Sequence, residues 1–219
     1  MNAIIRLISV VTFLGLLFSG TTVRAEGNIL YFILDASGSM WERVEGKPRI
    51  VIAKETLSSL IEKTPAEIRT GITAYGHRRK FDCSDIQEIV PLKSLDPITK
   101  YRVQERISTL SAMGKTPITD SIRQTVDRLK TEEGRSTIVL ISDGLESCGK
   151  DPCALTSELK SSGINFVMHV VGFGLTQEQE QKLSCISAAG EGKFFTAGNA
   201  VDLLDALMVV KESVVEQVE

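Results

Sequence analysis

A short segment after an apolar stretch carries three oxygen-bearing side chains at alternate positions. Residues 31–41 read YFILDASGSMW, in which Asp35, Ser37 and Ser39 are separated by single small residues. Ser, Gly and Asp are common in turns, and an aspartate can cap a following helix, so a purely structural role is one interpretation. The other interpretation is that the three side chains converge on a ligand.

Two further oxygen donors occur where the pattern predicts the end of a strand and the start of a helix. Asp143 follows the apolar segment STIVLIS, and Thr116 ends the loop segment SAMGKT. Functional residues of an open parallel sheet collect at the carboxyl ends of its strands, so we expect both residues to lie beside Asp35. Two carboxylates and three hydroxyls would then surround one point, a hard-oxygen set that suits Mg²⁺ or Mn²⁺ and suits Ca²⁺ less well.

A site of this composition predicts binding and not bond cleavage. Three of the five donors are neutral, so a divalent ion would keep much of its positive charge and would have room for one more oxygen ligand. The best additional ligand is a carboxylate from outside, so we expect a protein partner that presents an Asp or a Glu.

Three short motifs together resemble a known family. The segments DASGSM (35–40) and SDG (142–144), with Thr116 inside GKTP, resemble the three parts of the metal-ion-dependent adhesion site of von Willebrand factor type A domains. The resemblance implies a Rossmann-like sandwich with a divalent ion at the top of the sheet. It also implies that Thr116 binds the ion directly only with ligand present, and that Asp143 acts directly or through water. The stretches DASGSMW and AYGHRRKFDC are similar to those of exported bacterial members of the family.

Apolar strands alternate with amphipathic helices along the chain, which indicates right-handed βαβ units. We expect an α/β fold, a Rossmann-like doubly wound three-layer α/β/α sandwich with a mostly parallel sheet and one antiparallel edge strand. The edge strand is 85–92, which is short, mixed and interrupted by Pro91. Thr116 and Pro117 are expected to cap and to begin the helix 116–130. The other expected strands are 28–34, 69–76, 136–144, 164–174 and 193–197, and the other expected helices are 49–63, 100–111, 151–163, 176–190 and 200–217.

The first 25 residues have the pattern of a secretory signal peptide. Arg6 precedes an apolar core at 7–18, and a small-residue cleavage site, Val-Arg-Ala, ends at Ala25. The core is shorter than the ~20 residues that a membrane span needs, although an uncleaved N-terminal anchor is the alternative. We therefore expect a periplasmic or secreted protein with one domain over 26–219 and no membrane span in the mature chain.

All four cysteines lie in the part that is expected to be exported, which favours two disulfides. Cys83 and Cys148 are expected in loops on the metal side, and Cys153 and Cys185 on helices of one face. This placement favours Cys83–Cys148 with Cys153–Cys185. The alternative pairs Cys148 with Cys153 and Cys83 with Cys185.

Residues near the predicted strand ends outline a rim around the ion. His77, Arg78 and Arg79 follow the second strand, where they either attract an acidic partner or form a solvated loop. Trp41 either anchors a partner or packs beneath its own loop, and packing is favoured. Gly144 directly follows Asp143 on the same rim.

We expect a non-enzymatic, metal-dependent protein-binding domain that serves adhesion or protein assembly. The net charge of −3 and the scattered basic residues exclude the basic surface that nucleic-acid binding needs. The alternative function is a metal-dependent hydrolase or phosphatase with Asp35 as nucleophile. Phosphatases of the haloacid dehalogenase type need a second Asp where this chain has Ser37, and the sequence has no GxSxG motif. A third possibility is that the ion only stabilises the fold.

Overall fold

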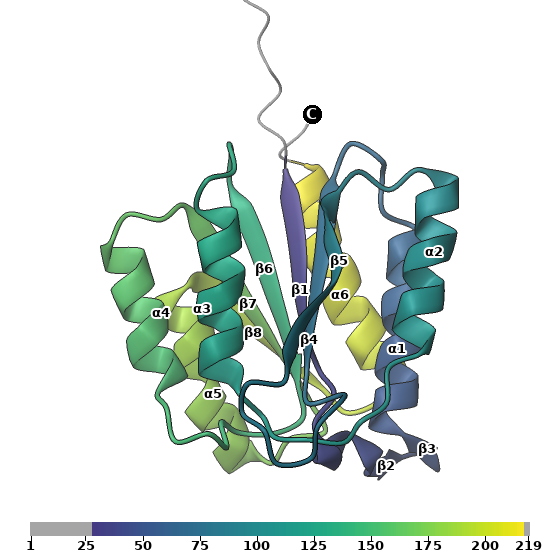
Figure 1. Cartoon of the computed structure of the whole chain (residues 1–219), viewed down its shortest axis with the longest axis vertical. Coiled ribbons are helices and arrows are strands. Elements are labelled where there is room, and N and C mark those ends of the chain that lie inside the picture. Colours follow the sequence, from purple (N-terminus) through teal and green to yellow (C-terminus); the bar gives the residue numbers. More distant parts are fainter. Residues whose placement is uncertain (1–27, 217–219) are drawn as a thin grey trace, which may run out of the picture.

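The apolar segments form a sheet between two layers of helices in the computed structural model, which describes residues 28–216 (Figure 1). The expected signal peptide, 1–25, lies outside the described residues. The sheet strands are β1 (Ile29–Asp35), β4 (Arg69–Tyr75), β5 (Ile86–Lys93), β6 (Ser136–Ser142), β7 (Phe166–Phe173) and β8 (Glu191–Ala197). The helices are α1 (Arg49–Glu62), α2 (Pro97–Ser108), α3 (Ile118–Leu129), α4 (Pro152–Ser161), α5 (Gln177–Ala189) and α6 (Ala200–Val215).

The order of the strands places β1 in the middle of the sheet, with the order β5-β4-β1-β6-β7-β8. Strands β1, β4, β6, β7 and β8 are parallel, whereas β5 pairs with β4 in the antiparallel sense at one edge. This arrangement confirms the predicted mostly parallel sheet with an antiparallel edge strand. Asp35 is paired in register with Tyr75, and Leu34 with Ile141, so the carboxyl ends of the three central strands lie together.

The period of two along β1 divides the core into two layers. Phe32 packs with residues of α1, α2 and α6, whereas Tyr31 and Ile33 pack with residues of α3, α4 and α5. All seven residues of β1 are buried because helices cover both faces of the sheet. Figure 1 shows α3, α4 and α5 on the left of the sheet and α1, α2 and α6 on the right, which is the predicted three-layer sandwich.

The predicted start of helix α3 was wrong by two residues. The helix begins at Ile118, the preceding Pro117 provides no side-chain cap, and the backbone N–H of Thr116 donates instead to Ser147 Oγ at 2.8 Å. Glu146 caps the helix from a distant loop, because its Oε2 accepts from both the N–H and the hydroxyl of Thr119 at 2.8 Å. A tertiary contact therefore replaces the local cap that the sequence pattern indicated.

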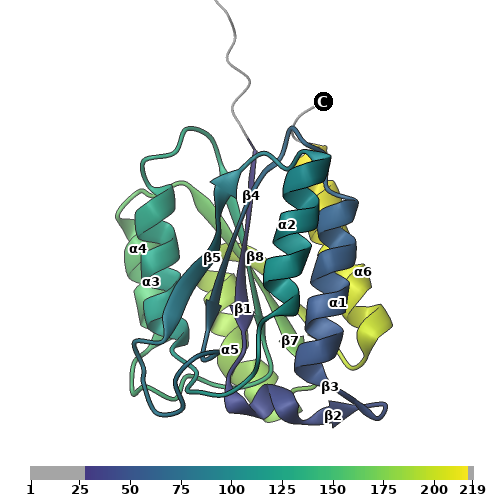
Figure 2. The same cartoon turned by 45° about the vertical axis from the view of Figure 1, so that its right-hand side comes forward.

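Two small elements between β1 and α1 were not predicted. A 3-10 helix, η1 (Gly38–Trp41), follows the first strand, and a hairpin of β2 (Arg43–Val44) and β3 (Lys47–Pro48) precedes α1. Helix α2 also begins earlier than expected, at Pro97, because the Asp96 side chain accepts a hydrogen bond from the N–H of Thr99. Figure 2 shows η1 and the hairpin at the lower end of the sheet, below α1. This is the end at which β1, β4 and β6 terminate.

None of the helices within residues 28–216 combines the length and the apolar character that crossing a membrane requires.

Candidate functional site

Asp35 ends the central strand and is fully buried beneath the edge of the sheet. Its Oδ1 accepts from the backbone N–H of Ser37 at 2.7 Å, and its Oδ2 accepts from the hydroxyl of Ser142 at 2.7 Å. Burial raises the pKa of this carboxyl, although hydrogen bonds from Ser37 and Ser142 partly offset the rise. The carboxylate of Asp35 is therefore out of contact with solvent in the folded protein.

The two serines of the alternating segment form a hydrogen-bond chain to the second aspartate. The hydroxyls of Ser37 and Ser39 lie 3.1 Å apart, and the Ser39 hydroxyl donates to Asp143 Oδ1 at 2.6 Å. Ser37 is also held by an isolated bridge to Gly114. The structure thus brings together four of the five predicted oxygen donors: Asp35, Ser37, Ser39 and Asp143.

Thr116, the fifth predicted donor, lies on the neighbouring loop and is 7% exposed. Its carbonyl accepts from the N–H of Ser147 at 3.1 Å, in addition to the contact of its own N–H with that serine. Within residues 28–216, its hydroxyl is not part of the hydrogen-bond chain that joins the other four donors. The backbone of Thr116 is therefore held by Ser147, while in the described part of the chain the Thr116 side chain has no hydrogen bond to either carboxylate.

Arg49, at the first position of α1, is a site residue that sequence reasoning missed. Its guanidinium lies 3.0 Å from Asp143 Oδ2 and 2.9 Å from Glu42 Oε2, and it donates to the carbonyl of Gly174 at 2.9 Å. The sequence placed it only at the start of the expected helix 49–63. Arg49 lies between the buried Asp143 and the exposed Glu42, and with all groups ionised the cluster of Asp35, Asp143, Glu42 and Arg49 carries a formal net charge of −2.

The pKa of Asp143 is raised to about 7. Burial is the largest cause and the nearby charge of Asp35 is the second, whereas hydrogen bonds from Ser39 and Arg49 lower it. The raised pKa indicates that the two carboxylates repel each other and have lost their solvent. A cation bound between them would favour their ionised forms and would lower the pKa of Asp143.

A tyrosine and a serine beneath the site also escaped the sequence analysis. The hydroxyl of Tyr75 donates to Ser142 Oγ at 3.2 Å, and Ser142 in turn donates to Asp35. Burial raises the pKa of Tyr75 well above its usual value, so this side chain stays a neutral donor. Both residues occupy the last positions of their strands, which is the signal that could have identified them.

The predicted rim residues differ in their exposure to solvent and in their hydrogen-bond partners. Trp41 is 53% exposed, and its indole N–H donates to the carbonyl of Ala112 at 2.7 Å, so the favoured prediction that it packs beneath its loop was wrong. His77 Nε2 lies 3.0 Å from Gln87 Oε1, and burial lowers the pKa of this histidine, which favours its neutral form. Gly144 lies beside Ser39, where a Cβ would meet the serine hydroxyl at 3.6 Å.

Arg78 and Arg79 belong largely to an internal structure of the loop after β4. Buried Asp85 accepts from the backbone N–H of both arginines, at 2.7 and 2.8 Å, and from Arg78 Nε at 2.7 Å. Burial raises the pKa of Asp85, but the hydrogen bonds from these two backbone N–H groups outweigh that effect and hold the pKa below its usual value. Arg79 also pairs with Asp82 at 2.6 Å. Much of the basic charge predicted for the rim is thus neutralised locally.

Two disulfides tie the surroundings of the site. Cys83 is bonded to Cys148, which joins the loop after β4 to the loop after β6, and Cys153 is bonded to Cys185, which joins α4 to α5. This is the connectivity that the predicted positions of the cysteines favoured. The first disulfide crosslinks two loops of the rim.

The donor set fits a hard divalent cation. Within residues 28–216, no three His, Cys, Asp or Glu side chains gather as a possible metal site, so the ligand set of a zinc site is missing there. The donors that do gather are the carboxylate oxygens of Asp35 and Asp143 and the hydroxyl oxygens of Ser37 and Ser39. Oxygen ligands of this kind suit Mg²⁺, Mn²⁺ or Ca²⁺. A divalent ion would offset the two formal negative charges of the cluster formed by Asp35, Asp143, Glu42 and Arg49.

Comparisons with known proteins agree on one fold family. The family model described as von Willebrand factor type A domain matches residues 30–207. The uncharacterized protein YwmD of Bacillus subtilis (strain 168) is 27% identical over 186 residues, which are 81% of each chain.

Two solved structures show the same fold at low sequence identity. The conserved hypothetical protein BatB from Bacteroides thetaiotaomicron has a TM-score of 0.68 at 18% identity, over 87% of this chain and 98% of that one. The pilus adhesin SpaC from Lactobacillus rhamnosus GG has a TM-score of 0.73 at 12% identity, over 87% of this chain and 31% of that one.

Proposed function

Because the chain belongs to the von Willebrand factor type A domain family, we propose that it is an exported domain that binds a protein ligand through a divalent metal ion. The ion is Mg²⁺ or Mn²⁺, and its last ligand is an Asp or Glu side chain of the partner. The single observation that carries the proposal is the hydrogen-bond chain in which Ser37 and Ser39 connect the two carboxylate positions, Asp35 and Asp143.

The charges of the site support an ion and an acidic partner together. Asp35 and Asp143 are both buried, and within residues 28–216 only Arg49 forms an ion pair with either of them. A divalent ion held by two carboxylates and neutral hydroxyls would keep an open position for a carboxylate from outside. Thr116 would join the ligands when the partner is present, because its loop already lies at the same edge of the sheet.

The relatives and the disulfides support a role outside the cytoplasm. One protein of the same fold is a pilus adhesin, and the present chain has two disulfides, which form and persist in oxidising compartments. Adhesion or assembly of another exported protein is the role that agrees with both observations.

A hydrolase with Asp35 as nucleophile is disfavoured by the position of this carboxylate. Asp35 has no exposed surface, and each of its oxygens already accepts a hydrogen bond. A nucleophile must reach the substrate, and this carboxylate instead lies beneath the serines. We therefore propose a binding domain and no catalytic role.

Titration calorimetry with MgCl₂, MnCl₂ and CaCl₂ tests the ion. We expect one site per chain, weaker binding in Ser39→Ala and no binding in Asp143→Asn. Asp127→Asn is the matched control, since Asp127 is an exposed carboxylate that pairs with Lys130 and lies outside the site. Absence of binding by both Mg²⁺ and Mn²⁺ in the wild-type protein would refute the proposal.

Partner capture from the exported fraction, with and without EDTA, tests the role of the ion. We expect a partner that is lost with EDTA and with Ser39→Ala, while Asp127→Asn retains it. If the ion only stabilises the fold, the variant will lose thermal stability and will still capture the same partner.

A further inference from the structure

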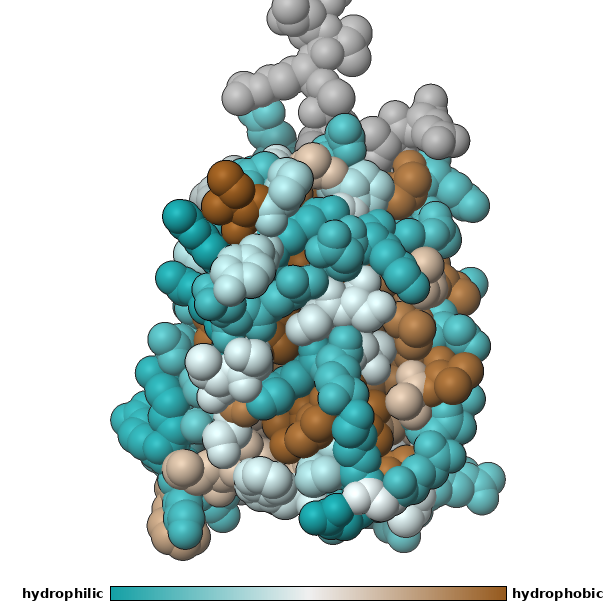
Figure 3. All heavy atoms as spheres, turned by 90° about the vertical axis from the view of Figure 1, so that its right-hand side faces the viewer, coloured by the Kyte–Doolittle hydropathy of each residue, from teal (hydrophilic) through white to brown (hydrophobic). Residues whose placement is uncertain are grey.

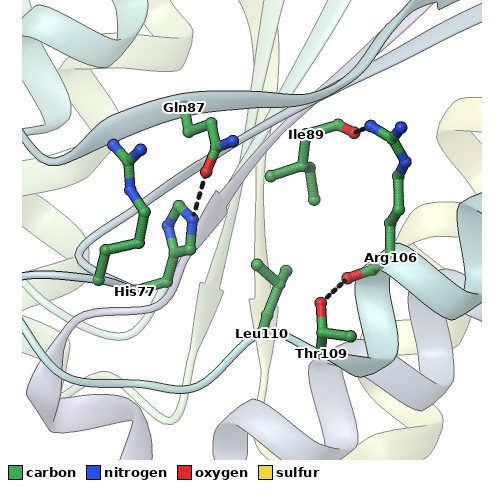
Figure 4. A pocket seen from close by; sticks show the side chains of 7 residues that line it. His77, Gln87, Ile89, Arg106, Thr109 and Leu110 are labelled. Atoms are coloured by element: carbon green, nitrogen blue, oxygen red, sulfur yellow. Dashed lines mark hydrogen bonds between the residues drawn. The ribbon is translucent and has the colours of Figure 1, made fainter.

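A small groove lies between the edge strand β5 and the C-terminal end of α2, outside the proposed metal site. Its volume is about 240 Å³, and its apolar floor is formed by Ile89 from β5 and Leu110 from the segment after α2, which are 6% and 5% exposed. Figure 4 shows these two side chains pointing toward one another, with His77 and Gln87 on one side and Arg106 on the other. On this side of the molecule, Figure 3 shows hydrophobic areas separated by hydrophilic ones.

The polar lining of the groove is basic. Arg78 and Arg106 both line it, and its lining includes no Asp or Glu. The charge of Arg78 is balanced by Asp85, whereas Arg106 has no ion pair with a carboxylate anywhere in residues 28–216. The groove therefore combines an apolar lining with one uncompensated positive charge.

The two arginines also decide how a partner can approach the edge strand. Arg106 donates to the carbonyl of Ile89 at 2.9 Å, and Arg78 donates to the carbonyl of Ile86 at 3.2 Å. An added strand needs these carbonyls for its own hydrogen bonds, so the side chains block extension of the sheet at this edge. A ligand must therefore bind through its side chains.

The size of the groove limits the kind of ligand. Pockets for small molecules and cofactors usually enclose ~300–1,000 Å³, so this open groove is too small for one of them. It can accept one aliphatic side chain with a neighbouring carboxylate. An extended segment of a protein presents such a pair on adjacent residues.

We infer that this groove binds a segment of a partner protein that carries an acidic residue next to an aliphatic one. The aliphatic side chain packs against Ile89 and Leu110, and the carboxylate pairs with Arg106. Arg106 has free N–H groups for this contact, because only one of its terminal nitrogens donates to Ile89. Gln87 supplies an amide on the opposite side of the groove, where its Oε1 lies 3.0 Å from His77 Nε2.

The groove is continuous with the rim of the proposed metal site. His77 follows Gly76, where a Cβ would lie 3.0 Å from the Cα of Ser37, and Leu110 lies two residues before Ala112, which holds Trp41. A single partner can therefore contact the groove and the rim at once. The groove itself needs no metal ion, so this inference does not depend on the proposed function.

Amide chemical shifts of the ¹⁵N-labelled protein in EDTA test the groove. The probe is a peptide with blocked ends, Gly-Ser-Leu-Asp-Leu-Ser-Gly, and its matched control has Asn in place of Asp. We expect the acidic peptide to shift the amides of Gln87, Ile89 and Leu110 at millimolar concentrations, with an effect that weakens as salt is added. The neutral peptide should bind roughly tenfold more weakly, because a charge-assisted hydrogen bond is lost.

Two variants with a matched control locate the binding. Arg106→Gln removes the charge and Gln87→Glu adds a repelling carboxylate at constant size, and each should weaken binding roughly tenfold. Arg102→Gln removes an exposed charge one turn earlier on α2 and should bind like the wild type. Equal binding of the two peptides, wild-type binding by Arg106→Gln, or shifts confined to residues around Trp41 would overturn the inference. Because the titration contains EDTA, none of these results bears on the metal site.

Discussion

Replacing Arg49 by methionine tests the charge balance that we derive for the site. The arginine side chain is only 12% exposed, the Asp143 side chain is fully buried, and the two groups are 3.0 Å apart. Methionine keeps much of the aliphatic volume and removes the guanidinium. The variant therefore leaves two buried carboxylates without the cation that lies against them.

The expected loss follows from the burial of the pair. Removing one partner of a buried ion pair costs ~3–5 kcal/mol. Asp143 can relieve part of this cost by binding a proton, because its pKa is already about 7. We therefore expect the free energy of unfolding to fall by about 2–3 kcal/mol at neutral pH, which leaves a typical domain folded.

Urea unfolding followed by circular dichroism, in EDTA and in MgCl₂, measures this loss. Magnesium should stabilise Arg49→Met more than the wild type, because the ion replaces the missing positive charge. The control is Arg69→Met, since Arg69 pairs with Glu132 at 2.8 Å with about a third of each side chain exposed. Such exposed pairs contribute about 1 kcal/mol or less. Equal losses in the two variants, or no added effect of magnesium, would contradict the reasoning.

Three further predictions concern the supports of the site and the pH dependence of stability. Gly76→Ala should cost more than Gly163→Ala, by about 1–3 kcal/mol in urea unfolding, because both glycines have positive φ but only the first would place a Cβ 2.5 Å from a backbone carbonyl. Replacing Cys83 and Cys148 by Ser should lower the unfolding free energy by roughly 4 kcal/mol and speed hydrogen exchange in both rim loops, whereas removing the other disulfide leaves those loops protected. Burial and then nearby positive charges lower the pKa of His169 below 6.5, so its contribution to stability is present above about pH 6.5 and is lost as the pH falls through the folded pKa. An NMR titration of its ring protons that gave a pKa of 6.5 or higher would contradict this last prediction.

Local patterns along the chain determined the layers of the fold and most of the oxygen donors. The period of two in β1 places Phe32 and Ile33 on opposite helical layers, as the uninterrupted apolar run predicts. The alternation of Asp35, Ser37 and Ser39 also survives in the structure as one hydrogen-bond chain, because these residues follow each other directly after the strand. Information of this kind is local, so it can be read from neighbouring residues.

Contacts between different segments decided which charged site residues are paired and which polar groups cap the nearby helix. Arg49 neutralises Asp143 from 94 positions away, and Glu146 caps α3 in place of Thr116 from a different loop. Within the loop after β4, Asp85 pairs with Arg78, for which the sequence left open either attraction of an acidic partner or a solvated loop. These partners are chosen by the packing of loops at one edge of the sheet, where groups far apart in the chain meet in a space with little water. The sequence by itself determined four of the oxygen donors that gather there, and only the tertiary structure decided which other groups join them and how their charges are paired.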